Sequence, residues 1–260
     1  MGKKDERIKD LIEFLKLKNG ASIPELAEML NVSEMTVRRD LNSLKEQGII
    51  LDIPGAAVLN TEYLAIGERT NDYFLSEAST VNMKEKERIG RYAASLIQPD
   101  DCIIIDNGST VEFMTDHIDK NIKITILTCN LNILNKICYN KNISIIFGGG
   151  YYHPDTTLFE SPENIKLIQN TRATKVFSSA AGISEKMGVT CMYNYEVGIK
   201  QAIIESGAER VLLADSSKFG VIKPCFLTDV DCFDRIISDK KLSEEWVKLL
   251  RDKGIKLDLV

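Results

Sequence analysis

The sequence has no apolar run long enough to span a bilayer, and the basic residues Lys3 and Lys4 are not followed by the apolar core of a signal peptide. It also has no Cys-x-x-Cys pair, because its six cysteines are scattered, largely within apolar runs such as 102–105. We therefore expect a cytoplasmic protein with reduced core cysteines. Of only two histidines, neither His117 nor His153 has a second His or Cys at ligand spacing, so no metal or other cofactor is expected.

An excess of positive charge is also missing. The formal net charge is −5, and residues 1–60 carry nine Lys and Arg against ten Asp and Glu, a balance of −1. Bulk attraction to nucleic acid is therefore excluded, and any DNA binding must use locally clustered cations and the doubled contacts of an oligomer. The cations available for this are Lys3, Lys4, Arg7, Arg38, Arg39 and Lys45.

The segment from Val32 to Leu44 predicts a helix with two different faces. Val37, Leu41 and Leu44 recur at helical spacing and form an apolar stripe that packs inward. The opposite face offers guanidinium, hydroxyl and amide groups, which suit base edges and phosphates in a major groove. The candidate DNA-binding residues are Ser33, which also caps the helix, with Met35, Thr36, Arg38, Arg39, Asn42 and Lys45.

Together with the segment that precedes it, this helix is predicted to form a helix-turn-helix. Ser22 and Glu25 have the spacing of a capping box, and Asn31-Val32 then forms a tight turn between two short helices. A further helix is predicted over 8–15, and two short strands around a Pro-Gly turn within 49–59 predict a wing. On pattern alone, a small three-helix domain with a solvated arginine pair remains an alternative.

The 260 residues, 44% of them hydrophobic, are enough for two domains. We predict a winged helix-turn-helix domain over 1–60, a linker over 61–80, where no period is sustained, and an α/β domain over 81–260. Short β-branched runs alternate with helical segments after Pro99, which indicates a mostly parallel sheet covered on both faces. The predicted strands are 102–105, 122–127, 143–147, 175–178 and 211–214, and the predicted helices are 109–119, 130–140, 162–171, 193–206 and 243–253.

Polar and glycine residues follow four of these strands. Ligands of such sheets bind at the carboxyl ends of the strands, where glycine permits close approach and hydroxyls with free amides can hold an anion. We therefore expect one shared pocket with affinity for phosphate, although ordinary turn chemistry can place the same residue types there. The candidate ligand-binding residues are Asp106, Gly108, Ser109, Thr110, Thr128, Asn130, Gly149, Gly150, His153, Asp215 and Lys218.

Several of these segments resemble the DeoR family of bacterial transcription regulators. In the N-terminal part the resemblance rests on 36–41, on Gly48 and on a Gly-Ala wing, and in the second half on 106–110, Gly149-Gly150, Glu196 with Lys200, and 215–220. It implies a sensor domain similar in fold to ribose-5-phosphate isomerase, a phosphorylated sugar as effector, and Glu196 as a further ligand-binding residue. It also implies a homo-oligomeric repressor, dimer or tetramer, of a carbohydrate-metabolism operon.

The sequence departs from the family pattern at four places. Leu51-Asp52 and 54–57 replace the basic wing and its His-Gly-Gly-Ala tip, and Cys129 stands inside the Thr-Asn turn. His153 stands where a basic residue usually follows the glycine pair, and Ser161 replaces a later glycine. These departures bear on the phosphate contacts of the wing and on ligand preference.

An isomerase-like pocket also raises the hypothesis of an enzyme. Asp106, Glu196 or Asp215 could act as a base, and Lys218 could stabilise a developing enolate oxygen. A fold does not determine a function, however. A pocket attached to a DNA-binding domain has to bind its ligand and release it unchanged, rather than convert it. We therefore predict a sensor and not an enzyme.

Overall fold

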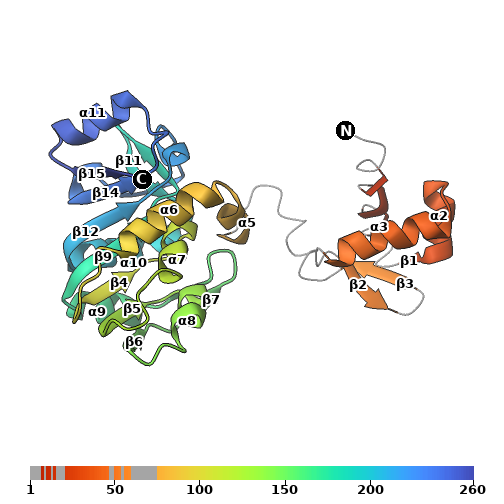
Figure 1. Ribbon diagram of the computed structural model, residues 1–260, viewed down its shortest axis with the longest axis horizontal. Helices are drawn as coiled ribbons and strands as arrows, with labels where there is room; N and C mark the ends of the chain where they lie inside the picture. The colour runs from red at the N-terminus through yellow and green to blue at the C-terminus, as the bar shows by residue number, and fades with distance from the viewer. Residues whose placement is uncertain are drawn as a thin grey trace. The chain divides into compact units, whose positions relative to one another are not determined.

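The computed structural model describes residues 7, 8, 10–12, 14, 15, 21–46, 50–53, 56–59 and 75–260. The chain divides into two compact units, Met1–Asp72 and Tyr73–Val260, and each is described by itself (Figure 1). Several expectations lie outside the described residues: the cations Lys3 and Lys4, the helix end at Gly48, the wing tip at Pro54-Gly55 and residues 61–74 of the linker.

The first unit contains the expected helix-turn-helix. Ser22 caps α2 (Ile23–Leu30), and its side chain and that of Glu25 form the predicted reciprocal capping box. Asn31 then adopts the left-handed conformation with φ 51°, which lets the chain turn sharply into α3 (Glu34–Glu46). At the start of α3, the hydroxyl of Ser33 accepts a hydrogen bond from the amide of Thr36 at 3.3 Å.

The core of this unit lies between α2, α3 and the described helical residues of segment 7–15. Leu11, Leu15, Leu26 and Val37 are fully buried, and Leu41 and Leu44 lie beside them, so the inward stripe of α3 is confirmed. The strands β1 (Ala21–Ser22), β3 (Ala56–Leu59) and β2 (Ile50–Ile53) form an antiparallel sheet in that order. Since β2 and β3 pair as a hairpin, the winged helix-turn-helix fold is confirmed.

The second unit is built on a seven-stranded sheet in the order β15-β14-β12-β9-β4-β5-β6, in which every pairing is parallel. This confirms the predicted α/β class. The interior strand β4 reads Cys-Ile-Ile-Ile, and its three isoleucines are fully buried because the sheet is covered on both faces. The strands are β4 (Cys102–Ile105), β5 (Ile124–Thr128), β6 (Ile143–Phe147), β9 (Ala173–Ser179), β12 (Gly207–Leu213), β14 (Arg235–Ser238) and β15 (Lys256–Leu259).

The helices cover opposite faces of this sheet (Figure 1). Ile103 and Ile105 pack with α6, α7 and α8, whereas Ile104, which points the other way, packs with α9 and α10. A third apolar cluster joins α11 to β14 and β15. The helices are α5 (Leu75–Thr80), α6 (Met83–Ala94), α7 (Ser109–Thr115), α8 (Leu131–Ile137), α9 (Pro162–Asn170), α10 (Asn194–Ser206) and α11 (Glu244–Asp252).

The strand order reverses beside β4. From β4 the chain adds β5 and β6 on one side, and then crosses back to place β9 on the other. Parallel sheets of this kind open a crevice at the carboxyl ends of the two strands that flank the reversal. The ends of β4 and β9 therefore mark the expected position of a ligand site.

Several elements differ from the sequence prediction. The strands β14 and β15 and an antiparallel sheet of β10 (Gly182–Ser184), β11 (Gly188–Cys191) and β13 (Cys225–Thr228) were not predicted. Helices α7 and α8 end earlier than expected, and Leu75–Thr80, within the predicted linker, is helical. The short apolar runs in β14 and β15 do not distinguish strand from loop, since the pairing that holds them comes from distant segments.

Candidate functional site

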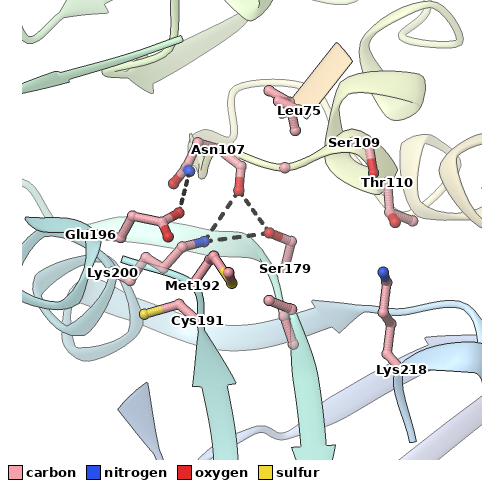
Figure 2. Close-up of a pocket in the computed structure, with 13 residues that line it drawn as sticks. Leu75, Asn107, Ser109, Thr110, Ser179, Cys191, Met192, Glu196, Lys200 and Lys218 are labelled. Atoms are coloured by element: carbon pink, nitrogen blue, oxygen red, sulfur yellow. Dashed lines mark hydrogen bonds between the residues drawn. The ribbon is translucent and has the colours of Figure 1, made fainter. Parts of the chain in front are cut away.

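A pocket opens at the carboxyl ends of β4 and β9, where the strand order reverses (Figure 2). Five of the predicted ligand-binding residues line it, namely Gly108, Ser109, Thr110, Glu196 and Lys218. The wall also contains residues that were not predicted to bind ligand, among them Leu75, Asn107, Ser179, Met192 and Lys200.

Beneath the pocket lies a buried ion pair. The ammonium of Lys200 on α10 donates to Asp106 Oδ2 at 2.5 Å, and the two side chains are 3% and 0% exposed. The same oxygen accepts from the Ser178 hydroxyl at 2.8 Å and from the Ser179 amide at 3.2 Å. Burial lowers the pKa of Lys200, but the negative charges of Asp106 and Glu196 outweigh it, so the pKa is raised above its usual value. Asp106 thus holds Lys200 in place and does not itself line the pocket.

At one end of the pocket, Asn107 and Glu196 form a second buried contact. Asn107 Nδ2 donates to Glu196 Oε1 at 2.7 Å, and the amide of Tyr193 donates to Glu196 Oε2 at 3.0 Å. The carbonyl oxygen of Asn107 accepts from the Ser179 hydroxyl at 2.6 Å and from Lys200 at 3.1 Å. The loop after β4 is therefore fastened to both β9 and α10.

The other end of the pocket offers groups that suit an anion. Ser109 and Thr110 begin α7 and are buried, and Lys218 ends the short helix η1 (Ser216–Lys218). In Figure 2 the ammonium of Lys218 points toward Thr110. Gly108 has φ 152°, and a Cβ there would collide with the hydroxyl of Ser179, so only glycine lets the loop approach β9 this closely.

Asp215 lies behind Lys218 and does not line the pocket. Its Oδ1 accepts from Asn82 Nδ2 at 2.9 Å and from the Ser217 amide at 3.1 Å. Lys86, which is 1% exposed, donates to the carbonyl oxygen of Ala78 in α5. Burial lowers the pKa of Lys86 to about 8; the Asp215 carboxylate opposes this shift, and the positive charge of Lys218 adds to it.

The remaining five predicted ligand residues lie away from this pocket. Asn130 caps α8 by accepting from the amide of Ile133 at 3.1 Å, and its Nδ2 donates to the carbonyl oxygen of Thr156 at 3.0 Å. Thr128 accepts from the backbone amide of Asn130. These two residues therefore support the loop between β7 (Tyr151–His153) and β8 (Leu158–Glu160).

Gly149, Gly150 and His153 belong to the same hairpin or its entry. Gly150 has φ 147°, and a Cβ there would collide with the carbonyl oxygen of Glu160. His153 Nε2 lies 2.8 Å from Glu160 Oε2, and its ring stacks on Tyr195 at 3.6 Å. The structure thus gives the set a role in holding the hairpin and does not bring it to the pocket.

The predicted DNA-binding residues lie on α3. The exposed residues are Met35, Arg38, Arg39, Asn42 and Lys45. Met35, the one apolar residue among these five, is 74% exposed. Ser33 is also exposed, and the half-buried hydroxyl of Thr36 hydrogen-bonds with it at 2.9 Å. Arg38 forms a weak surface pair with Glu34 at 3.6 Å, which leaves its fork available.

Arg7, which was among the cations considered available for DNA binding, forms an ion pair inside the first unit instead. Its guanidinium donates from Nε to Asp40 Oδ2 at 2.7 Å and from Nη2 to Oδ1 at 3.2 Å. Asp40 lies on the buried side of α3 and is 1% exposed. The hydrogen bond to Asp40 raises the pKa of Arg7, because it favours the charged form. Arg7 therefore fastens the first helix to α3.

Among the described residues there is no cluster of three or more His, Cys, Asp or Glu side chains that could hold a metal ion. In the same part of the chain, no helix is both long and apolar enough to cross a membrane.

Residues 7–63 match the model of the DeoR-like helix-turn-helix domain, and residues 81–240 match that of the DeoR C terminal sensor domain. The HTH-type transcriptional regulator IolR of Bacillus subtilis is 32% identical over 97% of this chain and 98% of its own. The regulator GolR of Listeria innocua is 31% identical over 96% of both chains, and the deoxyribose operon repressor of Escherichia coli K12 is 29% identical over 98% of both.

These three relatives are named as regulators or repressors of transcription, which supports a regulator and not an enzyme. Among solved structures, ribose 5-phosphate isomerase A from Methanocaldococcus jannaschii matches with a TM-score of 0.40 and 12% identity, over 53% of this chain and 55% of that chain.

Proposed function

The chain belongs to the DeoR family of transcription regulators, and from this premise we propose that it represses a carbohydrate-metabolism operon under the control of a phosphorylated sugar. The sugar phosphate would bind in the pocket between α7, β9 and η1. For control to follow, the effector must have a higher affinity for one arrangement of the DNA-binding units than for the other.

The observation that carries the proposal is the placement of Lys218 across from Ser109 and Thr110. Among the described residues Lys218 forms no ion pair, and the two hydroxyls form no side-chain hydrogen bond. A phosphate group would accept from all three, and such charge-assisted bonds are about twice as strong as neutral ones. The pocket is therefore matched to an anion at this end.

The DNA-binding half of the proposal rests on α3. Its exposed face carries Arg38 and Arg39, whose forks fit guanine edges or phosphates when a recognition helix lies in the major groove. Ser33, Met35, Thr36, Asn42 and Lys45 complete the proposed face. Because the N-terminal segment has a balance of −1, we propose that a homo-oligomer, dimer or tetramer, binds a repeated or palindromic operator.

The effector site is tested by thermal unfolding of the full-length protein. A phosphorylated sugar that binds should raise the melting temperature, whereas its unphosphorylated parent should do little. Lys218→Ala should abolish the shift and Lys218→Arg should retain part of it, since arginine keeps the charge. In the absence of ligand, Lys218→Ala should bind operator DNA as the wild type does. Equal stabilisation by the sugar and its phosphate would contradict the proposal.

The oligomer is tested separately. Sedimentation at micromolar concentration should give a dimer or larger species, and footprinting should show two related half-sites. A monomer that binds one unrepeated half-site tightly would refute this part of the proposal.

A further inference from the structure

Asn107 has one polar atom that its surroundings leave unmatched. The residue is 4% exposed and lines the pocket, and its Oδ1 is buried without a hydrogen-bond partner in the described part of the chain. Its other polar atoms are all used: the backbone amide donates to Asp106 Oδ1 at 2.7 Å, the carbonyl oxygen accepts from Ser179 and Lys200, and Nδ2 donates to Glu196. Oδ1 is thus the one polar atom of Asn107 that has no hydrogen-bond partner among the described residues.

The orientation of this amide is fixed by chemistry. Glu196 is a carboxylate that can only accept, and its Oε1 faces the amide group of Asn107 at 2.7 Å. A flipped amide would set two acceptor oxygens against each other. Since Glu196 Oε2 is held by the backbone amide of Tyr193, the carboxylate cannot turn away easily. Asn107 Oδ1 is therefore a permanent acceptor.

We propose that Asn107 is a specificity-determining residue that accepts a hydrogen bond from a hydroxyl group of the effector. The inference rests on the function proposed above, because it concerns the same pocket. In Figure 2, Asn107 and Glu196 lie at one end of the pocket, and Lys218 with Thr110 at the other. The effector would therefore be a molecule with a phosphate at one end and a hydroxyl presented to Asn107 at the other.

A hydroxyl fits this end better than an amine. The ammonium of Lys200 already donates to the carbonyl oxygen of Asn107 at 3.1 Å, so a second cation would meet a like charge close by. A neutral donor meets no such repulsion and satisfies Oδ1. An analogue without that hydroxyl would leave the buried oxygen unmatched, and such sites discriminate strongly against the missing group.

The proposal is tested by isothermal calorimetry on the full-length protein with a defined series of probes. The series contains inorganic phosphate, ribose 5-phosphate, glucose 6-phosphate, the unphosphorylated sugars ribose and glucose, and the deoxy analogues of all four that each lack one hydroxyl. With the wild type, removal of one particular hydroxyl should weaken binding by on the order of tenfold, whereas removal of the others should change it little. This measurement needs no variant, so it does not depend on how a substitution folds.

Variants then assign the effect to Asn107. With Asn107→Ala the deoxy analogue and its parent should bind equally, and the affinity for inorganic phosphate should stay as in the wild type. Met192→Ala, which alters the pocket wall elsewhere, should weaken all sugar phosphates by a similar factor and keep the discrimination. A variant Asn107→Ala that still discriminates as the wild type does would overturn the proposal.

The other outcomes separate this inference from the function it rests on. If sugar phosphates bind no more tightly than inorganic phosphate, the anion site stands and the role of Asn107 is refuted. If unphosphorylated sugars bind with the same single-hydroxyl discrimination and phosphate does not bind, the role of Asn107 stands and the phosphorylated effector is refuted. If none of the probes binds, both are refuted.

Discussion

The two candidate functional regions obtain their polar groups in opposite ways. On α3 the candidate residues follow one another along thirteen residues of chain and face solvent. In the sensor unit the pocket draws on the loop after β4 and on α7, β9, α10 and η1, and its polar residues are mostly buried. Exposed groups keep their water until a partner replaces it, whereas buried groups must satisfy one another. The pocket is therefore a buried hydrogen-bonded network, whereas the candidate DNA-binding residues form a surface that faces solvent.

Each unit also contains an ion pair with a buried carboxylate, and the two pairs differ in depth. Lys200 and Asp106 have side chains that are 3% and 0% exposed, whereas Arg7 is 23% exposed and Asp40 2%. In both pairs, removal of one partner leaves a buried charge without its counter-ion. The cost in unfolding free energy rises as water is excluded from that charge. The comparison predicts a graded series of effects.

The largest effect is expected from Lys200→Met. The Asp106 carboxylate would lose its counter-ion in a fully buried position, which costs about 3–5 kcal/mol of unfolding free energy. Urea unfolding followed by circular dichroism would measure the change. The double variant Asp106→Asn with Lys200→Met should recover part of the loss, since no charge is then left unpaired. A loss below that of Arg7→Met would reverse the comparison.

A smaller effect is expected from Arg7→Met. Asp40 would lose a partner that donates two hydrogen bonds and is partly exposed to water. The expected cost is about 1–3 kcal/mol of unfolding free energy. Hydrogen exchange of the α3 amides would report it within the first unit, and Arg7→Lys should retain part of the stability. If Arg7→Met instead changed the salt dependence of operator binding, Arg7 would be assigned to a contact with a DNA phosphate.

Arg38→Ala and Arg39→Ala should leave stability nearly unchanged and weaken operator binding. Loss of a forked base contact costs about 1–3 kcal/mol of binding free energy and relaxes the sequence preference at that position. Loss of a phosphate contact weakens binding to all sequences and reduces the salt slope by about one. Mobility shifts across salt concentrations distinguish the two cases. Unchanged binding by both variants would remove α3 from the role proposed for it.

A gradual effect, small over a fraction of a pH unit, is expected from the titration of Lys86. Burial lowers its folded-state pKa to about 8, while the unfolded chain keeps the ordinary, higher value. Between these values the unfolded state binds more protons, so stability rises with pH, by no more than about 1.4 kcal/mol per pH unit. Below pH 8 the contribution is constant. The difference in unfolding free energy between wild type and Lys86→Met, measured from pH 7 to 10, should show this rise, and a flat difference would contradict it.

The helix-turn-helix could be predicted from the sequence because its signals are local. Ser22 and Glu25 are three residues apart, and Val37, Leu41 and Leu44 share one helix. The alternation of strands and helices was local as well, and the parallel sheet confirmed it. The recognition of family motifs was confirmed by the matches to both family models.

The pocket could be predicted only in part, since its members meet through long-range packing. Gly108, Ser109 and Thr110 follow a strand and were found, but Ser179 and Lys200, which hold the loop at Asn107, lie more than 70 positions farther along the chain. Asn107 stood inside a segment already singled out, and its carboxylate partner Glu196 could have drawn attention to it. Asn130 was chosen as a ligand residue, yet it caps α8, because a turn after a strand serves either purpose. The assignment of ligand-binding residues stays a prediction.

Leu75 begins α5 in the second unit, and it belongs to the pocket. Its side chain is 2% exposed and lines the cavity, while its backbone amide donates to the carbonyl oxygen of Asp155 at 2.8 Å. The start of the second unit thus contributes to the wall of the pocket. Coupling between two binding sites is reciprocal, so operator DNA changes the affinity for effector by the same factor as effector changes the affinity for DNA. Under the proposed function, protein bound to its operator and protein free in solution would therefore respond to different concentrations of the effector.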